Sequence, residues 1–112
     1  MHTLRRTGAI SATELSASIR DYIVIDVRHL DAWQAGHVPG SIPLEIDTVS
    51  TTWTELDPWV PIVVVADDMA TAEIAVAQLR DRGRDTVVLE GGHAAWVAAA
   101  GCIVRCSQTR IS

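Results

Sequence analysis

The stretch PIVVVADDMATAEIAVAQLRDRG, residues 61–83, decides the fold class. Its first part, 62–66, is a continuous apolar run rich in β-branched residues, as expected of a strand buried on both faces of a parallel sheet. After a short polar break, the spacing i, i+3, i+4, i+7 predicts an amphipathic helix over 69–82. The buried face of this helix is expected to carry Ala72, Ala75, Val76 and Leu79. A strand followed directly by a helix is typical of an α/β fold.

The same alternation of strands and helices extends outward in both directions. We expect strands at 8–11, 22–27, 62–66 and 86–92, an extended segment at 37–46 and an edge strand at 102–104. We expect helices at 11–20, 30–36, 48–56, 69–82 and 94–101. Ser11 followed three residues later by Glu14 is typical of a capping box at the first helix. The pattern predicts a three-layer α/β domain with a central parallel sheet of about five strands and helices on both faces.

In parallel sheets, ligands bind beyond the carboxyl ends of the strands. The candidate site loops are therefore those after Val27, after Val65 and after Glu90. The loop after Val65 reads Ala66, Asp67, Asp68, Met69, Ala70, Thr71, with no obvious nucleophile, base or anion binder. Its two aspartates have a structural explanation, because Asp68 can cap the helix that follows.

The composition of the 112 residues argues against several classes of partner. The formal net charge is −5, which does not suit a nucleic-acid partner, since phosphate binding requires clustered Lys and Arg. The longest weakly apolar run, 94–104, is about half as long as a bilayer requires, and the N-terminus lacks the apolar stretch of a signal peptide. We expect a cytoplasmic protein without a membrane or nucleic-acid partner.

Cys102 and Cys106 are the two cysteines of the chain. A zinc site needs four ligands; His93 could be a third, but nothing supplies a fourth. We expect two reduced thiols, no metal and no cofactor.

Two long motifs resemble the signatures of rhodanese-like domains. VIDVRHLDAWQAGHVPGSIPL (24–44) matches the first signature in residue type and spacing, and VVLEGGHAAW (87–96) matches the second. The matching residues are Asp26, Val27, Arg28, Asp31, Trp33, Gly36, His37, Pro39, Gly40, Leu89, Glu90, Gly91, Gly92 and Trp96. The resemblance implies a rhodanese-like domain over 8–106, between tails at 1–7 and 107–112. It also implies that Asp26, Arg28, His37, Gly40, Gly91 and Gly92 support the loops rather than react.

Active members of that family carry sulfur on a cysteine that directly follows the central strand. The resemblance places that cysteine at Ala66, a loop glycine at Met69 and the loop arginine at Thr71, with no change in loop length. A methyl group cannot form a persulfide, because that chemistry needs a thiolate. Asp67 and Asp68 would also repel an anionic sulfur donor such as thiosulfate.

The resemblance therefore implies a non-catalytic binding or regulatory module with an unidentified protein partner. Homodimer formation is a further alternative. The alternative is a sulfurtransferase that uses Cys102 or Cys106 as a non-standard nucleophile. A phosphatase-like activity is the weakest hypothesis, since such loops also need the cysteine and the arginine.

Overall fold

A computed structural model of the chain describes residues 8–99. The strands are β1 (Ala9–Ile10), β2 (Ile23–Asp26), β3 (Ile42–Pro43), β4 (Ile62–Val65) and β5 (Thr86–Leu89). The α-helices are α1 (Ala12–Ala17), α2 (Leu30–Ala35), α3 (Ile46–Thr52), α4 (Met69–Asp81) and α5 (Gly92–Ala99). Two short 3-10 helices follow α1 and α3, at η2 (Ile19–Asp21) and η3 (Trp53–Glu55).

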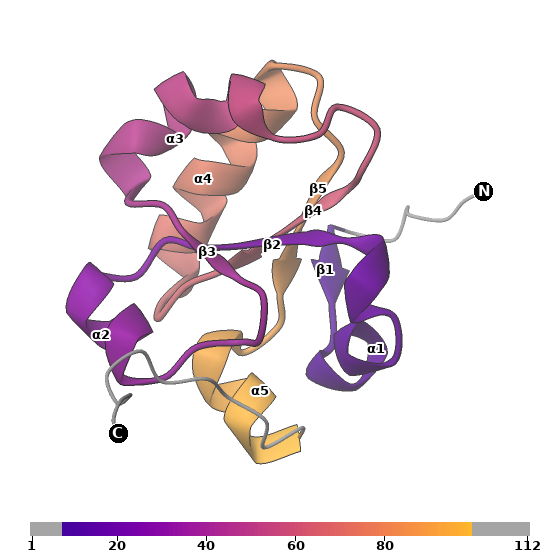
Figure 1. Ribbon diagram of the computed structural model, residues 1–112, viewed down its shortest axis with the longest axis vertical. Helices are drawn as coiled ribbons and strands as arrows, with labels where there is room; N and C mark the ends of the chain where they lie inside the picture. The colour runs from indigo at the N-terminus through magenta and orange to yellow at the C-terminus, as the bar shows by residue number, and fades with distance from the viewer. Residues whose placement is uncertain (1–7, 100–112) are drawn as a thin grey trace, which may run out of the picture.

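The five strands form one parallel sheet in the order β1-β5-β4-β2-β3. Figure 1 shows α3 and α4 on one side of this sheet and α1 and α5 on the other. The predicted three-layer α/β architecture is confirmed. Because all strands run in the same direction, their carboxyl ends meet at one edge of the sheet, and the loops that follow them share that edge.

The side chains of β4 are apolar on both faces of the sheet, so both faces must be covered by helices. Its residues alternate between two apolar clusters, and all four are fully buried. Ile62 and Val64 pack with the α3 and α4 side, together with Ala72, Ala75 and Leu79. Val63 and Val65 pack with Leu15 and Trp96 on the α1 and α5 side. A continuous apolar strand is stable here only because each face has its own helical layer.

The helix starts follow the capping residues seen in the sequence. Ser11 and Glu14 form the reciprocal capping box of α1, with both bonds at 3.0 Å. Asp68 caps α4 by accepting a hydrogen bond from the backbone N–H of Thr71 at 2.8 Å. Both predicted caps are confirmed, and the second fixes the start of α4 directly beside the loop after β4.

Several predicted boundaries are wrong. The helix expected at 48–56 begins at Ile46 and changes to a 3-10 helix at Trp53, because Glu45 already has the extended conformation of a residue that precedes a helix. The extended segment 37–46 accordingly ends before Ile46.

Two further differences concern helix ends. The helix expected at 94–101 begins at Gly92, inside the Gly-Gly turn, so the preceding strand ends at Leu89. The helix expected at 11–20 ends at Ala17 and is followed by η2. The predicted edge strand 102–104, both cysteines and both tails lie outside the described residues.

Candidate binding site at the carboxyl edge of the sheet

The site lies at the carboxyl ends of β2 and β4, two neighbouring strands after which the chain continues toward opposite edges of the sheet. β2 and β4 are adjacent, and Val27 N–H donates to the Val65 carbonyl at 2.9 Å just beyond their ends. After β2 the chain passes to β3, whereas after β4 it passes to β5 on the opposite side. The two loops separate there, which leaves the crevice in which α/β sheets bind ligands.

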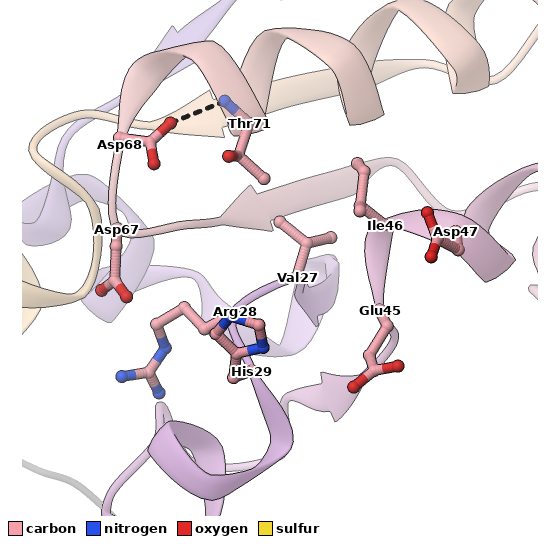
Figure 2. Close-up of a pocket in the computed structure, with 9 residues that line it drawn as sticks. All are labelled: Val27, Arg28, His29, Glu45, Ile46, Asp47, Asp67, Asp68 and Thr71. Atoms are coloured by element: carbon pink, nitrogen blue, oxygen red, sulfur yellow. Dashed lines mark hydrogen bonds between the residues drawn. The ribbon is translucent and has the colours of Figure 1, made fainter.

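A pocket of about 260 Å³ fills this crevice. Figure 2 shows it between the start of α4, the loop after β2 and the start of α3. Its lining consists of Val27, Arg28, His29, Glu45, Ile46, Asp47, Asp67, Asp68 and Thr71. Four of these side chains are carboxylates, and together they give the mouth of the pocket a negative charge.

Arg28 lines the pocket, but its charge is engaged elsewhere. Its guanidinium holds the carboxylate of Asp26 through Nε and Nη2 at 2.8 to 3.0 Å. Nη2 also donates to the Gly36 carbonyl at 2.8 Å, and both members of the ion pair are buried. Asp26 and Arg28, which the resemblance places among the loop-supporting residues, form a buried ion pair. It ties the end of β2 to the end of α2 and leaves little positive charge for a ligand.

The loop after β4 is short and well held. Ala66 is 4% exposed, whereas the following residues, Asp67 to Ala70, are exposed. The hydrogen bond from Thr71 N–H lowers the pKa of Asp68, so this carboxylate is ionised at neutral pH. Met69 is the first residue of α4, so its backbone is helical and does not need the positive φ that a glycine allows.

The turn between β5 and α5 supports the loop from the other side. Gly91 and Gly92 both have positive φ, at +73° and +63°. A Cβ built on Gly92 would overlap the carbonyl oxygen of Ala66, so the two backbones are in direct contact. Only glycine allows both the conformation and this close approach.

His93 lies in the first turn of α5, directly after Gly92. Burial lowers the pKa of His93, the positive charge of Arg28 lowers it further, and Asp26 and Asp67 act in the opposite sense. Its Nδ1 is buried and has no hydrogen-bond partner among the described residues. His93 is thus held mainly as the neutral imidazole beside the site.

The turn that contains His37 and Gly40 packs against α2 and does not line the pocket. His37 is buried, its Nδ1 lies 2.7 Å from the Trp33 carbonyl, and its ring stacks on the Trp33 indole at 3.8 Å. Gly40 has φ +80° and follows Pro39, and Ser41 N–H donates to the Val38 carbonyl. This geometry is that of a type II turn, which requires a glycine at this position.

The sequence predicts only part of this lining. It indicates Arg28, Asp67, Asp68, Thr71 and the loop after Val27, and the structure brings these together. The rest of the lining consists of His29, Glu45, Ile46 and Asp47. Glu45 and Asp47 follow β3, which lies within the extended segment expected at 37–46, so the rule that ligands bind beyond strand ends points to them once this segment is known to join the sheet.

Within residues 8–99, no three His, Cys, Asp or Glu side chains come together as ligands for a metal ion. Over the same range, none of the helices has the length and apolar character needed to cross a bilayer.

Comparisons with known proteins agree with this architecture. A family model described as the rhodanese-like domain matches residues 11–99. Thiosulfate sulfurtransferase GlpE of Pseudoalteromonas translucida (strain TAC 125) is 31% identical over 80 residues, which span 70% of this chain and 76% of the relative.

Two solved structures are similar over nearly the whole domain. The crystal structure of a rhodanese-related protein from Thermoplasma volcanium has 27% identity and a TM-score of 0.79, covering 86% of this chain and 96% of that one. The crystal structure of the Alr3790 protein from Anabaena sp. has 25% identity and a TM-score of 0.80, covering 88% and 82%.

Proposed function

The chain belongs to the rhodanese-like domain family. Because Ala66 stands where the resemblance places the sulfur-carrying cysteine, we propose that the chain acts as a non-catalytic binding or regulatory module. Its binding site is the pocket beside the loop that follows β4. The partner is a protein that presents positive charge to this pocket.

The residue that directly follows β4 carries the proposal. The resemblance assigns the sulfur-carrying cysteine to Ala66, and this side chain is a methyl group. The loop from Ala66 to Thr71 contains no thiol at any position, and both cysteines of the chain come after α5. Since the thiolate is the nucleophile in sulfur transfer, this loop cannot carry sulfur in the family's manner.

The charges around the pocket support binding of a cation rather than an anionic sulfur donor. Asp67 and Asp68 stand at the loop, and Glu45 and Asp47 stand opposite. Thr71 takes the place that the resemblance assigns to an arginine. Two like charges repel across a partly exposed pocket, so thiosulfate would be disfavoured where a Lys or Arg side chain would be attracted.

The framework around the loop also supports a binding role. Arg28 and Asp26 fix the loop after β2, and Gly92 packs against Ala66. These contacts keep the pocket in one shape before a partner arrives, which reduces the ordering cost of association.

A thiosulfate:cyanide sulfurtransferase assay on the pure full-length chain tests the proposal, together with mass spectrometry for persulfide sulfur. We expect turnover at the level of the blank without protein and no added sulfur mass. Turnover well above that blank would overturn the non-catalytic function.

The alternative is sulfur transfer through Cys102 or Cys106, which lie outside the described residues. It is favoured by the relative from Pseudoalteromonas translucida, whose name is that of a sulfurtransferase. A Cys102→Ser/Cys106→Ser variant decides between the two, since a sulfurtransferase of this kind would lose its labile sulfur and its turnover together.

A further inference from the structure

We propose that the pocket beside the β4 loop and a second pocket next to it, which is lined in part by apolar side chains, form one groove. This groove binds a protein segment in which a Lys or Arg side chain stands next to an aliphatic side chain. The inference rests on the proposed function, because it names the chemistry of the partner for the same site.

The two pockets adjoin. The second pocket, of about 290 Å³, is lined by Arg28, Leu30, Pro43, Leu44, Glu45 and Thr48. Arg28 and Glu45 also line the first pocket, so these two residues form the boundary between them. In Figure 2, Asp67 and Glu45 lie on opposite sides of Arg28 and His29, which places Asp67 at the far end of the groove.

Three of the carboxylates in the groove have no hydrogen-bond or ion-pair partner among the described residues. Asp68 caps α4 by accepting the Thr71 N–H at 2.8 Å. Glu45 is the N-cap residue of α3 and Asp47 lies in its first turn, but neither carboxylate, nor that of Asp67, makes a hydrogen bond or salt bridge to a residue that the structure describes. Since Arg28 is paired with Asp26, the first pocket presents negative charge that no nearby cation neutralises.

The second pocket supplies an apolar surface next to this charge. Leu30 is 43% exposed at the start of α2, opposite Pro43 and Leu44. An aliphatic side chain placed there would remove apolar surface of Leu30 from water, which stabilises binding. A partner that touched only the acidic half would leave Leu30 exposed.

A protein segment matches the groove better than a small amine does. Two pockets of about 260 and 290 Å³ lie side by side, and each suits a different side chain. Neighbouring residues of a peptide can fill both, with charge giving the register and the aliphatic contact adding affinity. A free amine or polyamine would fill the acidic half alone.

Labelled peptides test the groove directly. The probes are fluorescein-labelled hexapeptides of Gly and Ser that carry Arg-Leu or Leu-Arg at the centre, measured by fluorescence polarisation against the full-length chain. Matched probes replace Arg by Gln or Leu by Ser. We expect the Arg and Leu probes to bind more tightly than both single replacements, and the affinity of the charged probes to fall as salt increases.

Variants of the chain locate the binding. Glu45→Gln/Asp67→Asn should weaken binding about 2- to 5-fold for each charge removed. The control Glu55→Gln/Asp85→Asn has the same change in net charge at the opposite edge of the sheet and should leave the affinity unchanged. Leu30→Ser should weaken binding about 5- to 10-fold. Ile74→Ser is the control, since Ile74 is also exposed but lies on α4 and lines neither pocket, and it should leave the affinity unchanged.

The outcomes separate this inference from the proposed function. If the Gln and Ser probes bind as well as the Arg-Leu probes, or if both charge variants weaken binding equally, the groove does not recognise this segment. Full competition by spermidine, or self-association that is lost in Glu45→Gln/Asp67→Asn, would assign the groove to an amine or a second copy and overturn the inference. Sulfur transfer above the blank would instead overturn the non-catalytic function and leave the peptide result standing.

Discussion

The backbone of Gly92 lies directly against the carbonyl group of Ala66, so that a Cβ at position 92 would overlap the carbonyl oxygen. This contact joins the turn after β5 to the loop after β4, two segments that are distant in sequence. It explains why the chain needs a glycine at the start of α5, and it makes the position of Ala66 depend on the position of Gly92.

We expect Gly92→Ala to destabilise the protein by more than the cost of holding an alanine at positive φ. Positive φ costs an alanine about 1–2 kcal/mol, and the overlap with Ala66 adds to that cost. Gly83→Ala is the matched control, since Gly83 has φ +79° and nothing near its missing Cβ. Urea denaturation should show a larger loss for Gly92→Ala; equal losses would mean that the contact with Ala66 relaxes freely.

The buried ion pair of Asp26 and Arg28 gives a second prediction. Asp26→Asn leaves the Arg28 guanidinium buried without its carboxylate and should lower the free energy of unfolding by about 3–5 kcal/mol. The measurement is chemical denaturation at pH 7.

A double variant tests whether the unpaired charge is the cause of that loss. Asp26→Asn/Arg28→Met removes both charges and should be less destabilised than Asp26→Asn alone, because no buried charge is left uncompensated. A double variant that is as unstable as the sum of the two single changes would show that the charges act independently.

His93 should make the stability of the protein depend on pH between neutral and mildly acidic conditions. Its pKa is lowered in the folded protein, by burial first and by Arg28 second. The unfolded chain therefore binds more protons than the folded one once the pH falls below about 6.5, the ordinary value. Stability should decrease as the pH falls through this value, and the decrease should stop below the lowered pKa.

His93→Gln removes this titration, so its denaturation midpoint should depend less on pH between 7 and 5 than that of the wild type. His29→Gln, at an exposed position, is the control and should keep the wild-type dependence. If both variants follow the wild-type curve, other groups cause the loss of stability in acid.

Asp68 should make stability depend on pH in the same direction, but at lower pH. The hydrogen bond from Thr71 lowers its pKa below the ordinary 3.8, so the ionised cap stabilises α4 above that value and is lost as the pH falls through the lowered pKa. Asp68→Ala should lower the urea midpoint at pH 7, and the difference from the wild type should shrink toward pH 3. Asp67→Ala removes a neighbouring exposed carboxylate that caps nothing, and its midpoint should stay close to that of the wild type.

The sheet was predictable because the sequence of its central strand, β4, indicates that both faces of the sheet are buried. Four consecutive apolar residues, Ile62–Val65, indicate that helices pack on both faces of the sheet. The apolar periodicity of 69–82 predicts one of these helices. Local capping residues fixed the starts of α1 and α4 in the same way.

The pocket was predictable only in part, because one side of it follows a strand that the sequence marks only as part of an extended segment, 37–46. Strand β3 is two residues long and includes Pro43, so no apolar run marks it. The start of α3 was therefore placed too late, and Glu45 and Asp47 were not seen to face the β4 loop. The burial of His93 Nδ1 likewise depends on the packing of α5 and has no local signal.

Restoring a thiol at the loop tests whether Ala66 alone explains the proposed loss of catalysis. In a Cys102→Ser/Cys106→Ser background, Ala66→Cys places a sulfur directly after β4 next to two carboxylates. Negative charge raises the pKa of a thiol and repels thiosulfate. We expect this variant to react slowly with iodoacetamide and to gain little persulfide.

Adding Met69→Gly and Thr71→Arg to Ala66→Cys should raise both reactivities by about tenfold or more, since an arginine attracts the anionic donor and stabilises the thiolate. The glycine also permits a curled backbone where α4 now starts. The control carries the same two changes with Ala70→Cys, which puts the thiol within the first turn of α4, and it should stay unreactive. If Ala66→Cys alone reacts as fast as the triple variant, the loop still has the shape and potential of a sulfur site. In that case the missing cysteine is its sole defect.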